Sequence, residues 1–162
     1  MKKLIIFSAV PFFNTWPKKW KLDKFKNVGF QVTEIDVQRD ANAFLAQLNP
    51  MPDIVFNALH GRFGEDGCIQ GFLNILGVPY THSGVLASAI AMDKPMTKRI
   101  LREVGIRVAD HQILTREQLS DSFISFKPYV IKPINEGSSV GVKILDKWDN
   151  CFSEQENWPY GN

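Results

Sequence analysis

The chain has 162 residues, a length that fits one ordinary domain or two small ones. Apolar residues make up 44% and charged residues 22%, so the composition supports a folded core and excludes a disordered chain. The net charge is only +2, and no basic stripe with interleaved aromatic residues is present, which argues against a nucleic-acid partner.

The N-terminal residues superficially look like a signal peptide but fit a strand better. Lys2 and Lys3 precede an apolar run, residues 4–10, that is short for a signal sequence and has no small-residue cleavage site after it. No run approaches the length of a membrane span. The two cysteines, Cys68 and Cys151, have no metal-ligand spacing and fit a reducing compartment. We therefore expect a soluble, cytoplasmic protein with no membrane partner.

The first half of the chain alternates between strand and helix patterns. Short β-favouring apolar runs are followed by stretches whose apolar residues recur at helical spacing. The expected elements are strand 3–9, helix 20–28, strand 30–37, helix 41–48, strand 54–56, helix 68–76, strand 78–81 and helix 84–92. This order predicts an α/β fold with a parallel sheet and helical crossovers.

The pattern changes after one further helix. Asp93 is placed to cap that helix, with Pro95 in its first turn. Its apolar side chains, which we expect to be buried, are Ile100, Leu101 and Val104. Beyond it the expected elements are strands over 107–114, 129–132 and 142–145, and a helix over 116–122. A second domain is expected to begin between Ala91 and Lys94, which gives domains of residues 1–91 and 92–162.

A loop rich in glycine and ionisable side chains follows the third strand. It runs from Asn57 to Gly71 as NALHGRFGEDGCIQG. Ligands of open α/β sheets bind beyond the carboxyl ends of the strands, so a binding site is expected here. The alternative is a polar connecting loop, which is the more common role of such segments.

A second stretch, YVIKPINEGSSVGV over residues 129–142, places a lysine at the end of a strand and a small-residue loop after it. The backbone N–H groups and hydroxyls of such a loop can surround anionic oxygens, while Lys132 supplies a positive charge. The lysine precedes the glycines, so the stretch is not a P-loop. Taken alone, the segment is more often a simple turn, and Lys94 by itself indicates no function.

Together these stretches resemble the D-alanine–D-alanine ligase family of ATP-grasp enzymes. The resemblance runs from about Val32 to Asn162 and also includes VPYTHSGVLASAIAMDK at residues 78–94. It implies a Rossmann-like, pre-ATP-grasp N-terminal domain with a parallel sheet, followed by the first part of an α+β ATP-grasp domain. It also implies the family's reaction, in which ATP phosphorylates one D-alanine and the amine of a second attacks the acyl phosphate. The dipeptide product serves peptidoglycan synthesis.

The resemblance assigns roles to several residues. His60 matches a histidine beside the first D-alanine, although it could also serve only to order its loop. Glu65 and Asp66 look like carboxylates that organise this loop. His82 replaces the glycine common at its position and is expected at or near the surface.

The expected ATP site is built from two lysines and the small-residue loop. Ser138 matches a serine that is hydrogen-bonded to a glutamate and a tyrosine near the substrate, which makes it the catalytic candidate. The residues expected to contact ATP are Lys94, Lys132, Glu136, Gly137, Ser138 and Ser139. Mg²⁺ is implied as a cofactor, with its ligands outside this chain.

The sequence also departs from the family pattern. Residues 10–19, VPFFNTWPKK, stand where the family has a glycine-rich loop and a glutamate that anchors the first D-alanine. The chain ends before the adenine hinge, the catalytic arginine, the tyrosine partner of Ser138 and the metal ligands. We therefore expect no turnover by the isolated chain. The alternatives are a non-catalytic remnant or one half of a split ligase. The candidate protein partners are a second copy of the chain, in a homodimer, or a complementing C-terminal fragment. A D-alanine–D-lactate ligase is also compatible with these residues.

Overall fold

The computed structural model describes residues 1–8, 18–121, 128–137 and 139–146. The chain divides into two compact units, Met1–Ala89 and Ile90–Asn162, and the boundary between them falls inside one helix. None of the described helices is long and apolar enough to cross a membrane.

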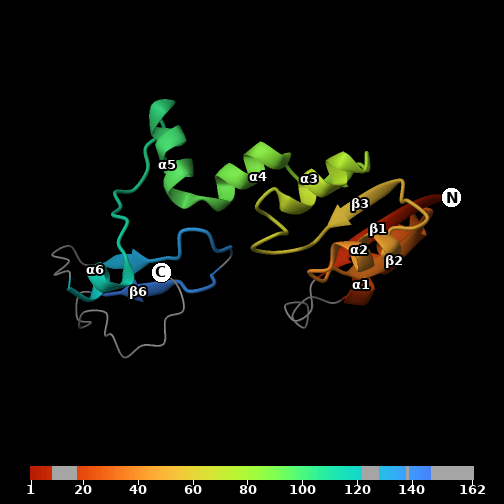
Figure 1. Ribbon diagram of the computed structural model, residues 1–162, viewed down its shortest axis with the longest axis horizontal. Helices are drawn as coiled ribbons and strands as arrows, with labels where there is room; N and C mark the ends of the chain where they lie inside the picture. The colour runs from red at the N-terminus through yellow and green to blue at the C-terminus, as the bar shows by residue number, and fades with distance from the viewer. Residues whose placement is uncertain (9–17, 122–127, 138, 147–162) are drawn as a thin grey trace. The chain divides into compact units, whose positions relative to one another are not determined.

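The first unit is built on a four-stranded parallel sheet (Figure 1). The strands lie in the order β2-β1-β3-β4, so β1 is central and pairs with both β2 and β3. Their bounds are β1 Lys2–Ser8, β2 Phe30–Asp36, β3 Ile54–Asn57 and β4 Tyr80–Thr81. The helices of this part of the chain are α1 Lys18–Asn27, α2 Ala41–Gln47, α3 Cys68–Ile75 and α4 Val85–Met92. The predicted α/β class and parallel sheet are confirmed.

The main core lies between one face of the sheet and helices α2 and α3. Phe7 of β1 packs edge-on against Phe44 of α2, with ring centroids 5.1 Å apart, and Phe44 in turn contacts Phe72 of α3 at 5.2 Å. The remaining buried side chains of this core are Ile5, Ile35, Leu48, Val55, Leu59, Ile69, Leu73 and Val78. The apolar residues that recur at every second position of the strands and at helical spacing in α2 and α3 therefore meet in this core, as their spacing predicts.

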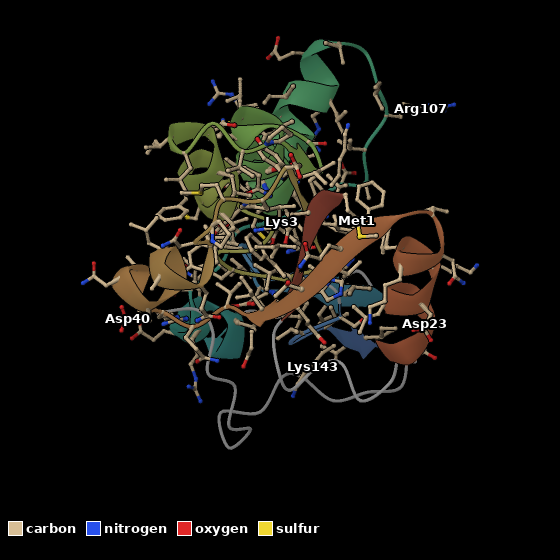
Figure 2. The ribbon with its side chains drawn as sticks, turned by 90° about the vertical axis from the view of Figure 1, so that its right-hand side faces the viewer. Met1, Lys3, Asp23, Asp40, Arg107 and Lys143 are labelled. Atoms are coloured by element: carbon tan, nitrogen blue, oxygen red, sulfur yellow. The ribbon has the colours of Figure 1, made fainter. Side chains whose placement is uncertain are left out.

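Helix α1 covers the opposite face of the sheet. Its Phe25 lies 5.3 Å from Phe56 of β3 and 6.4 Å from Phe30 of β2, between ring centroids. Figure 2 shows Asp23 on α1 and Asp40 at the start of α2 on opposite sides of the strands. Gly29, with φ +92°, ends α1 in the left-handed conformation that glycine adopts without strain.

The second unit contains a helix with a well-formed N-terminus and a two-stranded antiparallel sheet. Asp93 caps α5, as predicted, by accepting a hydrogen bond from the Met96 backbone N–H at 2.9 Å. Strand β5 pairs with β6, and Val130 lies directly opposite Ile144. The bounds are α5 Lys94–Glu103, α6 Arg116–Asp121, β5 Tyr129–Ile131 and β6 Lys143–Leu145.

Two expectations for the second unit are wrong. Residues 107–114 form no strand, since within the described part of the unit β5 and β6 pair only with each other and leave this segment without a partner strand. Helix α5 has no fully buried residue: Ile100 is 39% exposed, Val104 is 66% exposed and Leu101 is half-buried. Its amphipathic pattern identifies the apolar face, but the described residues cover that face only in part.

Candidate functional site

The loop after β3 is folded around one backbone carbonyl, that of Gly64. The side-chain amide of Asn57, at the end of β3, donates to this oxygen at 2.9 Å. The amide of Gln70, on α3, donates to the same oxygen at 3.0 Å. The Asn57 Oδ1 also accepts the Leu59 N–H at 3.1 Å, and both amide side chains are buried. Two amides from the flanking strand and helix therefore fix the path of the loop between them.

Gly64 leaves no room for a side chain. A Cβ placed there would lie 2.4 Å from the Leu59 Cβ and 3.1 Å from the Leu59 backbone carbon. These atoms are attached rigidly to the main chain, so rotation of a side chain cannot relieve the overlap. The close approach of the two backbone segments therefore requires glycine.

The two carboxylates of the loop bind its backbone, which agrees with the role expected for them. Glu65 Oε2 accepts the Gly61 N–H at 2.6 Å. Asp66 accepts the N–H groups of Phe63 and Cys68 at 2.8 and 3.1 Å. Burial disfavours ionisation of Asp66, but these N–H groups outweigh burial and hold its pKa below the usual value.

His60 projects from this organised loop and is accessible to a ligand. Its side chain is 61% exposed, and Nδ1 lies 3.7 Å from the Glu65 Oε1. At that distance the contact is electrostatic rather than a hydrogen bond. Glu65 therefore links the loop backbone to the imidazole, and the ring is held by its loop rather than by burial.

The second group of expected site residues lies in the second unit, at the start of α5 and in the β5–β6 loop (residues 132–142). Lys94 Nζ donates to the backbone carbonyls of Glu136 at 2.6 Å and Ile134 at 3.3 Å. Burial and the neighbouring Lys132 lower the pKa of Lys94, while Glu136 and Asp93 act in the opposite direction. The two lysines therefore lie close enough to repel each other.

Lys132 makes no hydrogen bond or ion pair with any residue that the structure describes. Further along the loop, the N–H groups of Val140 and Val142 donate to the carbonyls of Gly137 and Ser139, both at 3.3 Å. Ser138 lies outside the described residues. Lys94, Lys132, Glu136, Gly137 and Ser139 therefore belong to one loop and the helix start that it contacts, whereas His60 belongs to the first unit.

Sequence reasoning missed the roles of Asn57 and Gln70. One signal for Gln70 was available, because it lies on the buried side of α3 beside Ile69 and one turn before Leu73. A glutamine at a core-facing position needs hydrogen-bond partners, and here the carbonyl of Gly64 supplies one.

Comparison with known proteins identifies relatives of both units. Residues 11–83 match the family described as the D-ala D-ala ligase N-terminus, so the match begins upstream of the expected Val32. The D-alanine–D-alanine ligase of Acidiphilium cryptum is 54% identical over 138 residues, which are 85% of this chain and 46% of that enzyme. The Rhodospirillum rubrum ligase is 50% identical over 86% of this chain and 47% of its own length. The chain thus spans about half the length of the curated relatives it matches.

Solved structures agree. The D-alanine–D-alanine ligase of Bacillus anthracis matches with a TM-score of 0.67 and 29% identity, over 91% of this chain and 50% of that one. The same ligase complexed with ATP matches with a TM-score of 0.60 and 27% identity, over 91% of this chain and 51% of that one. Over the residues that these matches cover, the chain is similar in sequence and in fold to D-alanine–D-alanine ligases.

Proposed function

We propose that this chain supplies the part of an ATP-dependent D-alanine–D-alanine ligase that holds the first D-alanine and the ATP phosphates. His60 contacts D-alanine from the β3–α3 loop. Lys94, Lys132 and the backbone of the β5–β6 loop contact the phosphates. The dipeptide would serve peptidoglycan synthesis and the shape of the cell wall, and the reaction would take place in the cytoplasm.

The observation that carries this proposal is the pair Lys94 and Lys132. Lys94 is half-buried and Lys132 is exposed, and their two ammonium groups lie close enough to repel each other. Within the described residues Lys132 makes no ion pair, although Glu136 and Asp93 act against the repulsion at Lys94. A bound polyphosphate would add negative charge beside both lysines, which is why such a pair favours an anionic ligand.

The proposed chemistry uses these residues to bring two anions together. The carboxylate of the first D-alanine attacks the γ-phosphorus of ATP, and ADP leaves. The amine of a second D-alanine then attacks the acyl carbon, and phosphate leaves. Positive side chains lower the cost of bringing the carboxylate to the triphosphate. The described residues include no group of three His, Cys, Asp or Glu side chains that could hold a metal ion. We therefore assign no residue of this chain to Mg²⁺, the ion that the family resemblance implies.

ATP binding by the 162-residue chain tests the phosphate site. Lys132→Met should weaken ATP binding about ten-fold or more, because a charge-assisted contact contributes about 1.5–3 kcal/mol. Lys26→Met is the matched control, since it removes the same charge from the exposed end of α1 and should leave binding unchanged. Equal affinity of wild type and Lys132→Met would contradict the assignment.

D-Alanine binding tests the other site. In saturation-transfer NMR, His60→Ala should lose the D-alanine signal, whereas His82→Gly, which alters another exposed histidine of the first unit, should keep it. L-Alanine serves as the stereochemical control. An unchanged signal in His60→Ala would show that the imidazole is not a contact.

We also propose that polypeptide corresponding to the rest of the relatives' length covers the apolar surface of the second unit. Val130 and Ile144, opposite each other in the β5–β6 sheet, are 48% and 72% exposed, and the apolar face of α5 is only partly covered by the described residues. The 162-residue polypeptide alone should then show no D-alanine-dependent ADP release, and the amides of Val130 and Ile131 should exchange rapidly. Turnover by this polypeptide, or strong protection of these amides in a monomer, would overturn this second proposal.

A further inference from the structure

Lys94 is held at a fixed point of the second unit by the cap of α5. Asp93 Oδ1 accepts the Met96 N–H at 2.9 Å, and the Thr97 hydroxyl donates to the Asp93 carbonyl at the same distance. Lys94 is the first residue of the helix and is half-buried. Its backbone therefore has little freedom, and its side chain begins from a rigid support.

All the polar groups of Lys94 that donate in this structure point to one segment of the β5–β6 loop. The backbone N–H donates to the Ile134 carbonyl at 3.4 Å. The ammonium donates to the same carbonyl at 3.3 Å and to the Glu136 carbonyl at 2.6 Å. The shortest of these contacts has the geometry of a strong charge-assisted hydrogen bond. The Lys94 side chain thus contacts two residues that lie 40 and 42 positions further along the chain.

We propose that Lys94 is a positioning residue for the β5–β6 loop, and that its ammonium holds the backbone of Ile134–Glu136 in place beside the proposed phosphate site. The inference deepens the proposed phosphate site and rests on it for the identity of the anion. An ammonium has three donors, and two are used by the loop carbonyls. No described residue accepts from the third donor, and we assign it to a phosphate oxygen, so that one ammonium would bind both the loop and the ligand.

Lys132 differs from Lys94 in this respect. It lies near enough to influence the ionisation of Lys94, yet within the described part of the chain it holds no carbonyl and no carboxylate. Loss of Lys132 should therefore weaken anion binding while the ligand-free loop keeps its shape. Loss of Lys94 should weaken anion binding and should also change the shape of the ligand-free loop. This difference separates a positioning lysine from one that only contacts the anion.

The test compares Lys94→Met, Lys94→Arg and Lys132→Met in the full 162-residue chain by NMR. Without ligand, Lys94→Met should accelerate amide exchange of Val140 and Val142 about ten-fold or more, because their bonds to the Gly137 and Ser139 carbonyls depend on the loop backbone. Lys132→Met should leave these rates unchanged. Lys94→Arg, which keeps charged donors, should restore part of the protection. Unchanged amide exchange in Lys94→Met would overturn the proposal.

Inorganic triphosphate provides the second measurement. Its addition to the wild type should shift the Lys94 Nζ resonance, a signature that a purely structural lysine would not give. Triphosphate that binds without moving this resonance would also overturn the proposal. If triphosphate binds to no variant and not to the wild type, the phosphate-site proposal fails, while the ligand-free exchange rates still decide the positioning role. Amides of β1 and β3 report whether each variant remains folded.

Discussion

Gly64→Ala should strongly destabilise the first unit, although it adds only one methyl group. The new Cβ would lie 2.4 Å from the Leu59 Cβ, far inside the normal contact distance of about 3.5–4.0 Å between carbon atoms. Leu59 is a buried member of the core, so it cannot move outward freely. Relief of the overlap therefore requires the loop backbone to shift by about 1 Å or more.

The size of the effect follows from what that shift would break. Overpacking of a buried site typically costs about 1–3 kcal/mol. The Gly64 carbonyl also accepts two hydrogen bonds from buried amides, those of Asn57 and Gln70. A buried donor without a partner costs about 1–3 kcal/mol. Since part of this loss can be recovered by relaxation, we expect the free energy of unfolding to fall by about 3–5 kcal/mol.

Urea unfolding followed by far-UV circular dichroism measures this loss. Gly71→Ala is the matched control, because a Cβ at this position inside α3 meets only the Val85 Cγ2, at an ordinary contact distance of 3.9 Å, and the residue has no positive φ. Its free energy of unfolding should be unchanged or should rise by up to about 1 kcal/mol. A loss below about 1 kcal/mol in Gly64→Ala would refute the reasoning, since it would mean that the loop accommodates the methyl group without breaking its hydrogen bonds.

Four further predictions concern the first unit. His82→Gly should raise the free energy of unfolding by about 1 kcal/mol in thermal melts, because His82 has φ +141°, a conformation that strains residues with a Cβ; a lower melting temperature would contradict this. Leu73→Ala should lower the free energy of unfolding by about 2–5 kcal/mol, because Leu73 is fully buried, whereas exposed Leu86→Ala should change it by less than about 0.5 kcal/mol. Because the pKa of Asp66 is lowered in the folded protein, its carboxylate stabilises the fold above its unfolded pKa, near 3.8, and this contribution is lost as the pH falls through the folded value. Asp66→Asn should remove this part of the pH dependence of the free energy of unfolding. The same substitution should speed alkylation of Cys68, because the hydrogen bond to Asp66 raises the pKa of that thiol; an unchanged alkylation rate would show that Asp66 does not control it.

The elements that could be predicted from the sequence are those with local causes. Asp93 caps α5 through its own side chain, and Gly29 ends α1 through its own backbone conformation. Strands β1 and β3 were recognisable because each carries a compact apolar run, and β2 because apolar and polar residues alternate along it. The prediction of a strand over residues 107–114 is wrong for the opposite reason. A strand depends on a partner whose position in the chain a local pattern does not reveal.

The same distinction applies to the candidate site. Glu65 and Asp66 bind backbone groups within four residues of themselves, and their role could be predicted from the composition of the loop. The contribution of Gln70 could not be predicted in this way, because it reaches back from α3 to a carbonyl that only the folded loop presents. The contact between Lys94 and the β5–β6 loop spans about 40 residues and is likewise invisible to local patterns.

His60 shows how these non-local contacts support the proposed site. Its ring is mostly exposed, and its Nδ1 lies 3.7 Å from the Glu65 Oε1, which is too long for a hydrogen bond, so burial does not fix it. Its position depends on the loop backbone, which in turn depends on the amides that meet at the Gly64 carbonyl. A ligand contact gains affinity when its side chain is positioned before binding, because less motion must be lost on association. Disturbing Gly64 should therefore weaken any ligand contact made by His60, even where the imidazole itself is unchanged.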